Sequence, residues 1–221
     1  MATPSERRSA ILKAAARLFE HYGHGKTTIA DVAREAQVGV GTVYLEFESK
    51  EAIVSELSLS THVGVLEAMR AASTRGADHA ERLTAVFVVR TECFLQLGAK
   101  GQHACELLHC KTEGVQSAHQ RFRDQERALI VQLLQEGQQA GVFARSELSA
   151  TAALIQRAFA SLSPPWIFST NDADAIHTAR SMIALLLSGL IERGSSPSRS
   201  ITPTGRGKRS ASLSPSPKRA R

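Results

Sequence analysis

Apolar residues recur at intervals of three and four positions along most of this chain, which is the spacing of one face of an α-helix. The pattern predicts a first helix that begins at Pro4, where Thr3 to Glu6 form a capping box, and that ends before Gly23. Its inward face is expected to hold Ile11, Leu12, Ala15, Leu18, Phe19 and Tyr22.

Two short helices joined by a tight corner are expected between residues 26 and 51. Thr28 can cap the first through its hydroxyl, with Asp31 answering three residues later. The inward residues of this helix should be Ile29, Val32, Ala33 and Ala36. Gly39 is an acceptable N-cap for the second helix, residues 40–47. Its inward positions should be Val43 and Phe47, and its outward positions Thr42, Tyr44, Leu45 and Glu46, which need a polar partner such as DNA.

The rest of the chain predicts further helices, with no strand and no internal repeat. The expected ranges are about 49–72, 83–97 ending at Gly98, a short helix around 104–111, a long helix through 122–134 closed by Gly141, 149–162, and about 172–193. The last two must be separate because Pro164 and Pro165 lie between them.

These elements predict an all-α protein in three parts. Residues 1–48 should form a helix-turn-helix domain, and residues 49–193 a helical regulatory and dimerisation domain. Residues 194–221 contain almost nothing apolar and should be a disordered basic tail, because they cannot bury enough surface to offset the entropy of ordering.

Residues 26–51 resemble the helix-turn-helix of the tetracycline-repressor (TetR) family of bacterial transcription regulators, and the resemblance extends over roughly residues 8–55. The matching positions are Thr27-Thr28, Val32-Ala33, Ala36, Val38, Gly41 to Tyr44, Phe47 and Lys50-Glu51. The resemblance implies DNA contacts by Thr27, Thr28, Thr42, Tyr44 and Lys50. Our full candidate set for DNA binding is Lys26, Thr27, Thr28, Gly39, Val40, Thr42, Tyr44, Leu45, Glu46 and Lys50.

Three positions depart from the family's pattern. Gln37 stands where the family usually has a turn glycine, which predicts a looser corner, and Gly39 replaces the usual serine, which removes a phosphate-binding hydroxyl. Glu46 lies where histidine or tyrosine is common; a carboxylate repels phosphate, but it can accept a hydrogen bond from cytosine N4.

The positive charge of the chain is concentrated in its tail. The formal net charge is +6, but the seven basic residues after position 193 are accompanied by no acid, which leaves 20 basic against 21 acidic residues in the rest. The charge of the folded part is therefore no argument for DNA binding by its whole surface. The tail itself should add phosphate contacts without choosing a sequence.

The sequence also indicates an intracellular protein. Three cysteines do not suggest a disulfide framework, and the N-terminus lacks the apolar segment of a signal peptide. The apolar run 182–191 is too short for the ~20 residues that span a bilayer. We expect a cytoplasmic, nucleoid-associated protein with no membrane partner.

Two patterns raise other chemistry. Gly25-Lys26-Thr27 looks like the end of a P-loop, but Glu20 occupies the position of the required glycine. Cys105 and His109 lie four residues apart on one expected helical face, beside His103 and Cys110, and could bind a metal. Small apolar cysteines packed in a helix explain the same pattern. We therefore expect no cofactor, no metal and no enzymatic activity, and keep a metal- or thiol-responsive regulator using Cys105 and His109 as the alternative.

The apolar segment 183–191 needs cover on more than one side, either as a central core helix or by a second subunit. The expected dimer interface is Ala152, Ile155, Phe159, Ile183, Leu187 and Leu190, and paired recognition helices would lie one DNA turn apart, ~34 Å. The resemblance implies a homodimeric repressor that a small-molecule effector releases from double-stranded operator DNA. The candidate pocket walls are Leu66, Met69, Phe87, Cys93, His109, Phe122, Leu129, Phe159 and Trp166.

Overall fold

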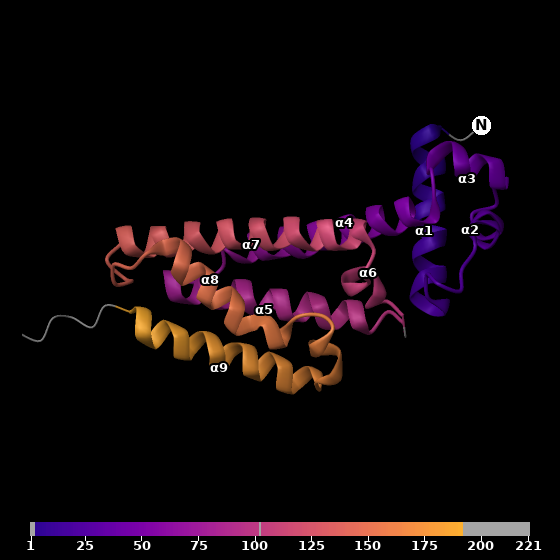
Figure 1. Ribbon diagram of the computed structural model, residues 1–221. Coiled ribbons are helices and arrows are strands. Elements are labelled where there is room, and N and C mark those ends of the chain that lie inside the picture. Colours follow the sequence, from indigo (N-terminus) through magenta and orange to yellow (C-terminus); the bar gives the residue numbers. More distant parts are fainter. Residues whose placement is uncertain (1–2, 102, 192–221) are drawn as a thin grey trace, which may run out of the picture.

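The computed structural model describes residues 3–101 and 103–191. The α-helices are α1 (Pro4–Tyr22), α2 (Ile29–Glu35), α3 (Val40–Glu46), α4 (Lys50–Ala72), α5 (His79–Gly98), α6 (Glu106–His109), α7 (Glu113–Gln139), α8 (Leu148–Ala158) and α9 (Asp172–Leu190), with 3-10 turns η1 (Phe159–Leu162) and η2 (Trp166–Ser169). Figure 1 shows α1 to α3 gathered at one end, and α4 leading from them into an elongated bundle formed with α5, α7, α8 and α9.

The expected all-α fold is confirmed; the described residues contain no strand, only an isolated bridge between Phe143 and Ile191. The expected tail lies outside the described residues.

Three helix starts that the sequence predicts are confirmed by their caps. Thr3 and Glu6 form a capping box at α1, as Thr28 and Asp31 do at α2. Ser49 caps α4 by accepting a hydrogen bond from the amide of Ala52. One inward assignment on α1 is wrong: Tyr22, in its last turn, is 54% exposed.

Two hydrophobic clusters divide the protein. The first joins α1, α2 and α3 to the beginning of α4, where Ile53 and Val54 are buried. The second joins the later turns of α4 to α5, α7, α8 and α9. The first cluster thus extends beyond residue 48, and one unbroken helix contributes to both clusters.

A second connection between the clusters lies at α6. Leu107 is buried in the first cluster and its neighbour Leu108 in the second. The Glu106 carboxylate lies 2.8 Å from His24 Nδ1 and 2.8 Å from His103 Nδ1. Burial alone would raise the pKa of Glu106, but these hydrogen bonds lower it overall. Glu106 therefore binds the end of α1 to the second domain as a carboxylate.

The residues expected to form a dimer interface face the protomer's own core. Ala152, Ile155, Phe159, Ile183 and Leu187 are buried, and Leu190 packs against the same cluster. The reason is that α8 packs on α7 and α9 packs on α5. Five of the six expected interface residues are thus core residues of the protomer, whereas Leu190 is only partly buried. The large apolar side chains that α8 and α9 do expose are Leu154 (67% exposed) and Leu185 (75% exposed).

A buried histidine in α4 leads to a prediction about pH. His62 is buried, and its Nδ1 lies 2.8 Å from the carbonyl oxygen of Ser58. Burial lowers the pKa of His62 to about 4; the hydrogen bond that the Ser58 carbonyl accepts opposes this shift, and His119 adds a smaller lowering. An unfolded histidine titrates near 6.5, so between about pH 6.5 and 4 only the unfolded chain gains the proton. We expect the free energy of unfolding to fall by roughly 2–3 kcal/mol from pH 7 to 4.5 through His62.

Urea unfolding of the wild type and of His62→Gln at both pH values would measure this. The variant should lose less stability on acidification than the wild type does. An equal loss in both proteins would show that other groups cause the acid sensitivity.

Candidate nucleic-acid interface and the cleft of the second domain

The corner between α2 and α3 is tight although it lacks a glycine. Gln37 adopts a φ of +57°, in the left-handed region that glycine usually occupies. The amide of Val38 then donates to the carbonyl oxygen of Ala33 at 3.0 Å, which closes the end of α2. The left-handed conformation costs a non-glycine residue roughly 1–2 kcal/mol. The looser corner expected from Gln37 is therefore wrong.

Helix α3 presents an exposed face above two buried anchors. Val43 and Phe47 are buried against α1 and α2, as expected. Tyr44 is 55% exposed and Leu45 86% exposed, while Val40 is exposed and Thr42 partly so. Gly39 starts the helix without a side-chain cap. The first cluster thus holds α3 so that an aromatic ring, a hydroxyl and two aliphatic side chains face outward.

Glu46 does not share this outward face. Its carboxylate lies 3.6 Å from Arg7 Nε and 4.0 Å from Arg8 Nη1, and its side chain is only 15% exposed. Arg8 also donates to the backbone carbonyl of Glu46 and lies over the Phe47 ring. The prediction that Glu46 faces a DNA groove is corrected: two arginines of α1 draw it back across the end of α3.

Two other candidate contacts face the protein as well. Thr27 is 3% exposed, and its hydroxyl donates to the carbonyl oxygen of Gly23 at 2.9 Å. Lys50 Nζ donates to the carbonyl oxygens of His24 (2.7 Å) and Thr27 (3.1 Å). Their expected side-chain contacts with DNA are therefore corrected: both residues hold the loop between α1 and α2 against α4. Lys26 and Thr28 remain exposed.

The position of Glu46 generates a prediction about sequence preference. Glu46→Gln should leave the preferred base unchanged at every position of a DNA half-site, because the side chain points toward α1 and not toward bases. Selection of DNA from a random pool by the wild type and the variant would compare the two preferences. A base change confined to one position per half-site would show that Glu46 reads a base after all.

The second domain contains a cleft of about 460 Å³ between α5, α7, α8 and the η1–η2 segment. Its walls include Arg90, Phe94, His119, Phe122, Arg123, Glu126, Arg127, Gln156, Arg157, Pro164 and Trp166. Of the pocket residues expected from the sequence, Phe122 and Trp166 line this cleft. Leu66, Met69, Phe87 and Phe159 are instead packed in the core, and Cys93, His109 and Leu129 border other, smaller recesses, of which the one at His109 shares His119 and Pro164 with the cleft. These seven residues therefore do not line this cleft, because residues that share a cleft come from helices whose relative rotation the sequence pattern does not specify.

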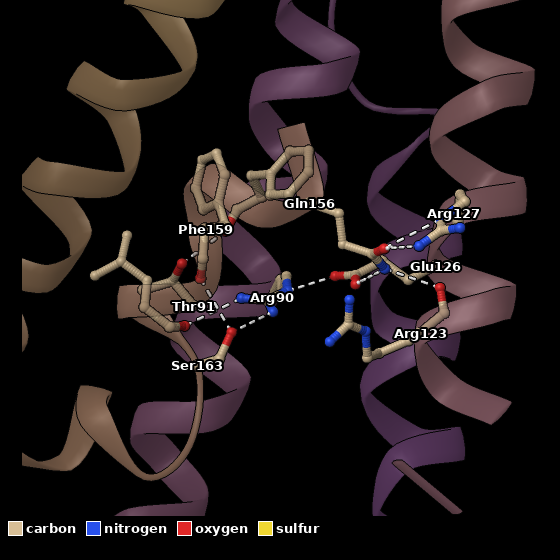
Figure 2. A network of polar contacts seen from close by, with 10 residues as sticks. Arg90, Thr91, Arg123, Glu126, Arg127, Gln156, Phe159 and Ser163 are labelled. Atoms are coloured by element: carbon tan, nitrogen blue, oxygen red, sulfur yellow. Dashed lines mark hydrogen bonds and ion pairs between the residues drawn. The ribbon is translucent and has the colours of Figure 1, made fainter. Parts of the chain in front are cut away.

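A buried arginine forms the inner end of the cleft (Figure 2). Arg90 Nε donates to Glu126 Oε1 at 2.5 Å, Nη1 to the carbonyl oxygen of Leu162 at 3.0 Å, and Nη2 to Ser163 Oγ at 2.7 Å. Its guanidinium also lies 4.9 Å from the centre of the Phe94 ring. The Arg90–Glu126 pair therefore ties α5 to α7 and to the end of η1, and its charges offset each other inside the protein.

Gln156 of α8 extends the network outward (Figure 2). Its Nε2 donates to Glu126 Oε2 at 2.6 Å and to the carbonyl oxygen of Arg123 at 2.8 Å. Its Oε1 accepts from Arg127 at 3.1 and 3.3 Å. One neutral amide thus links the buried carboxylate to the arginine side of the cleft.

The cysteine and histidine pattern is placed differently from the expected helical face. Cys105 precedes the short helix α6, and His109 is exposed at the end of that helix. Burial raises the pKa of the Cys105 thiol, which favours its protonated form. Within residues 3–101 and 103–191, no three His, Cys, Asp or Glu side chains gather as a metal site. The same part of the chain contains no helix long and apolar enough to cross a bilayer.

Comparison with known proteins agrees with the geometry of the first domain. Residues 11–57 match the family model described as bacterial regulatory proteins, tetR family. HbdR, a transcriptional regulator of Aromatoleum sp. (strain CIB), is 45% identical over 49 residues, which are 22% of this chain and 21% of HbdR. AcrR, a transcriptional regulator of Shigella flexneri, is 28% identical over 191 residues, covering 82% of this chain and 88% of AcrR. The match to HbdR thus spans only about a fifth of that protein.

The whole described fold is also similar to solved structures. The fatty acid degradation regulator FadR from Bacillus halodurans superposes with a TM-score of 0.62 at 19% identity, over 83% of this chain and 95% of FadR. At that identity the likeness concerns the fold alone. It extends through the second domain, beyond the residues that the family model matches.

Proposed function

Because this chain belongs to the TetR family of bacterial regulatory proteins, we propose that it is a transcriptional repressor that binds operator DNA as a homodimer and is released by a small-molecule effector. The family is one of regulators and not of enzymes. In this proposal residues 1–48, completed by the first turns of α4, bind DNA, and the remaining helices bind the effector and the second subunit. The protein would act in the cytoplasm, where the chromosome is accessible.

The observation that carries the proposal is the exposed face of α3. Tyr44 and Thr42 can donate hydrogen bonds to phosphates or base edges, and Val40 and Leu45 can contact thymine methyl groups. Lys26, Thr28 and Gly39 lie on the neighbouring loop and helix starts and complete the proposed contact set. Thr27, Glu46 and Lys50 support this surface from within.

Removing single hydroxyl groups from this face should weaken operator binding without unfolding the protein. We expect Thr42→Ala and Tyr44→Phe each to lower the affinity for selected operator DNA roughly two- to tenfold, the worth of one hydrogen bond. Stability should change by less than about 0.5 kcal/mol, since both side chains lie at the surface. Fluorescence anisotropy would measure the affinity.

Thr74→Ala serves as the control, because Thr74 is an exposed threonine just beyond the end of α4 and belongs neither to α3 nor to the proposed dimer surface. That variant should bind operator as the wild type does. If both α3 variants kept full affinity, α3 would not be the surface that contacts DNA.

We place the proposed dimer interface on the outer faces of α8 and α9. Leu154 and Leu185 are large apolar side chains that these helices expose, and burying each against a second copy would contribute roughly 1.5–3 kcal/mol. A homodimer would present two α3 helices to successive major grooves, which compensates for the weak binding of one short helix.

A charge at this surface should separate the subunits without disturbing either core. We expect Leu185→Asp to give a folded monomer, whereas Leu187→Asp would unfold the protomer because Leu187 is buried. Light scattering over a range of protein concentrations and circular dichroism would test this. Val63→Asp, which places the same charge at an exposed residue of α4, should leave the dimer intact. A Leu185→Asp protein that stays dimeric would move the interface elsewhere.

A further inference from the structure

The charged groups around the cleft of the second domain are predominantly positive. Four arginines line it, Arg90, Arg123, Arg127 and Arg157, against one carboxylate, Glu126. Burial, and then the nearby Arg123, lower the pKa of His119 at the same wall, so its ring is neutral at pH 7 and adds no charge. A cleft lined mainly by one sign of charge concentrates ligands of the opposite sign.

The excess positive charge lies at the outer side of the cleft. Glu126 is already paired with Arg90, and both side chains are almost completely buried. Arg127 is hydrogen-bonded to the neutral amide of Gln156. Within the described part of the chain, no carboxylate lies within ion-pair distance of Arg123, Arg127 or Arg157. These three guanidinium groups therefore remain available to an incoming anion. A carboxylate suits them, because its two oxygens match the paired N–H donors of a guanidinium group.

The apolar side chains that line the cleft are largely aromatic. They include Phe94, Phe122, Pro164 and Trp166, and Trp166 is the only tryptophan of the chain. Its side chain is largely exposed at the cleft, although tryptophan is normally well buried. A flat apolar body placed against Trp166 would cover its exposed side chain, while Phe122, which is only 3% exposed, lines the cleft beside it. A volume of about 460 Å³ is that of a small-molecule site.

We propose that this cleft binds a small organic anion, with its carboxylate on Arg123, Arg127 and Arg157 and its flat apolar body against Phe122 and Trp166. The proposal rests on the proposed function in one respect, since such an anion would be the effector that releases the repressor from DNA. Binding to the cleft itself does not require DNA.

Matched pairs of a ring carboxylate and its neutral amide test the charge requirement: benzoate and benzamide, 1-naphthaleneacetate and 1-naphthaleneacetamide, and indole-3-acetate and indole-3-acetamide. Calorimetry on the full chain should give at least tenfold tighter binding for the carboxylate of one or more pairs. The single tryptophan indole N–H resonance in ¹⁵N-labelled protein should shift on titration, which locates the site. Inorganic phosphate alone should bind much more weakly, because it lacks the apolar body.

Two kinds of variant separate the two halves of the site. Arg123→Gln combined with Arg157→Gln should weaken carboxylate binding about tenfold or more and leave amide binding unchanged. Arg121→Gln is the control: Arg121 is exposed on α7, as Arg123 is, but does not line the cleft, so the change in affinity should stay below twofold. Trp166→Ala should weaken the carboxylate and the amide by the same factor.

Three results would overturn the proposal: equal affinity for carboxylate and amide in every pair, no binding by any probe, or an equal loss in the Arg121 and Arg123/Arg157 variants. A separate measurement of DNA binding by anisotropy distinguishes a failure of the cleft proposal from a failure of the proposed repressor function. If the cleft does not bind anions while operator binding is intact, only the effector class is wrong. If anions bind but no DNA is selected, the proposed repressor function is wrong and the cleft assignment stands.

Discussion

Because α4 is unbroken from Lys50 to Ala72, its first and later turns cannot move independently. Ile53 and Val54 are buried with α1 and α3, whereas Val65, Leu66 and Met69 are buried with the helices of the second domain. Close-packed interiors have little free volume, so a shift of α4 in one core must be accommodated in the other. Because α4 belongs to both cores, the orientation of α3 depends on how α4 packs against the helices of the second domain.

Helix α6 limits the movements that α4 allows. Leu107 and Leu108 pack into different clusters, and Glu106 joins His24 of the first domain to His103 of the second. A simple swing of the first domain about α4 would break these contacts and expose Leu107. The two domains are therefore connected at two separate points, α4 and α6. Any displacement of α3 would require both helices to shift together.

The features that the sequence predicted well are local. A cap such as Thr28 with Asp31, or a terminator such as Gly141, acts within a few residues, so these helix ends could be read from the chain. Helix α7 starts at Glu113, nine residues before the first expected apolar position, Phe122, and has no side-chain cap to mark that start. The expected helix 149–162 ends at Ala158 and continues as the 3-10 turn η1. The side-chain roles that were wrong depend on distant partners: Glu46 turns to Arg7 and Arg8, almost forty positions earlier. Similarly, a segment that is apolar nearly all round gives no sign of which side meets α5, so Leu187 and Leu185 could not be distinguished.

The polar network around Gln156 suggests how binding at the cleft reaches α4. Separating the buried Arg90–Glu126 pair would cost roughly 3–5 kcal/mol, so this pair is a fixed point. Among the described residues, the Arg127 side chain is hydrogen-bonded to the neutral Gln156 side chain. The proposed anion would compete for Arg127 and remove this one link between α7 and α8, while Gln156 keeps its hydrogen bonds to Glu126 and Arg123 and the buried pair stays intact. Helix α7 packs along α4, so a small change in its position acts on the helix that carries the DNA-binding domain. The free energy that can shift α4 is the difference between the anion's binding free energies for the DNA-binding and the released arrangements of the helices. A coupling free energy of ~1–3 kcal/mol would change operator affinity about 5- to 150-fold.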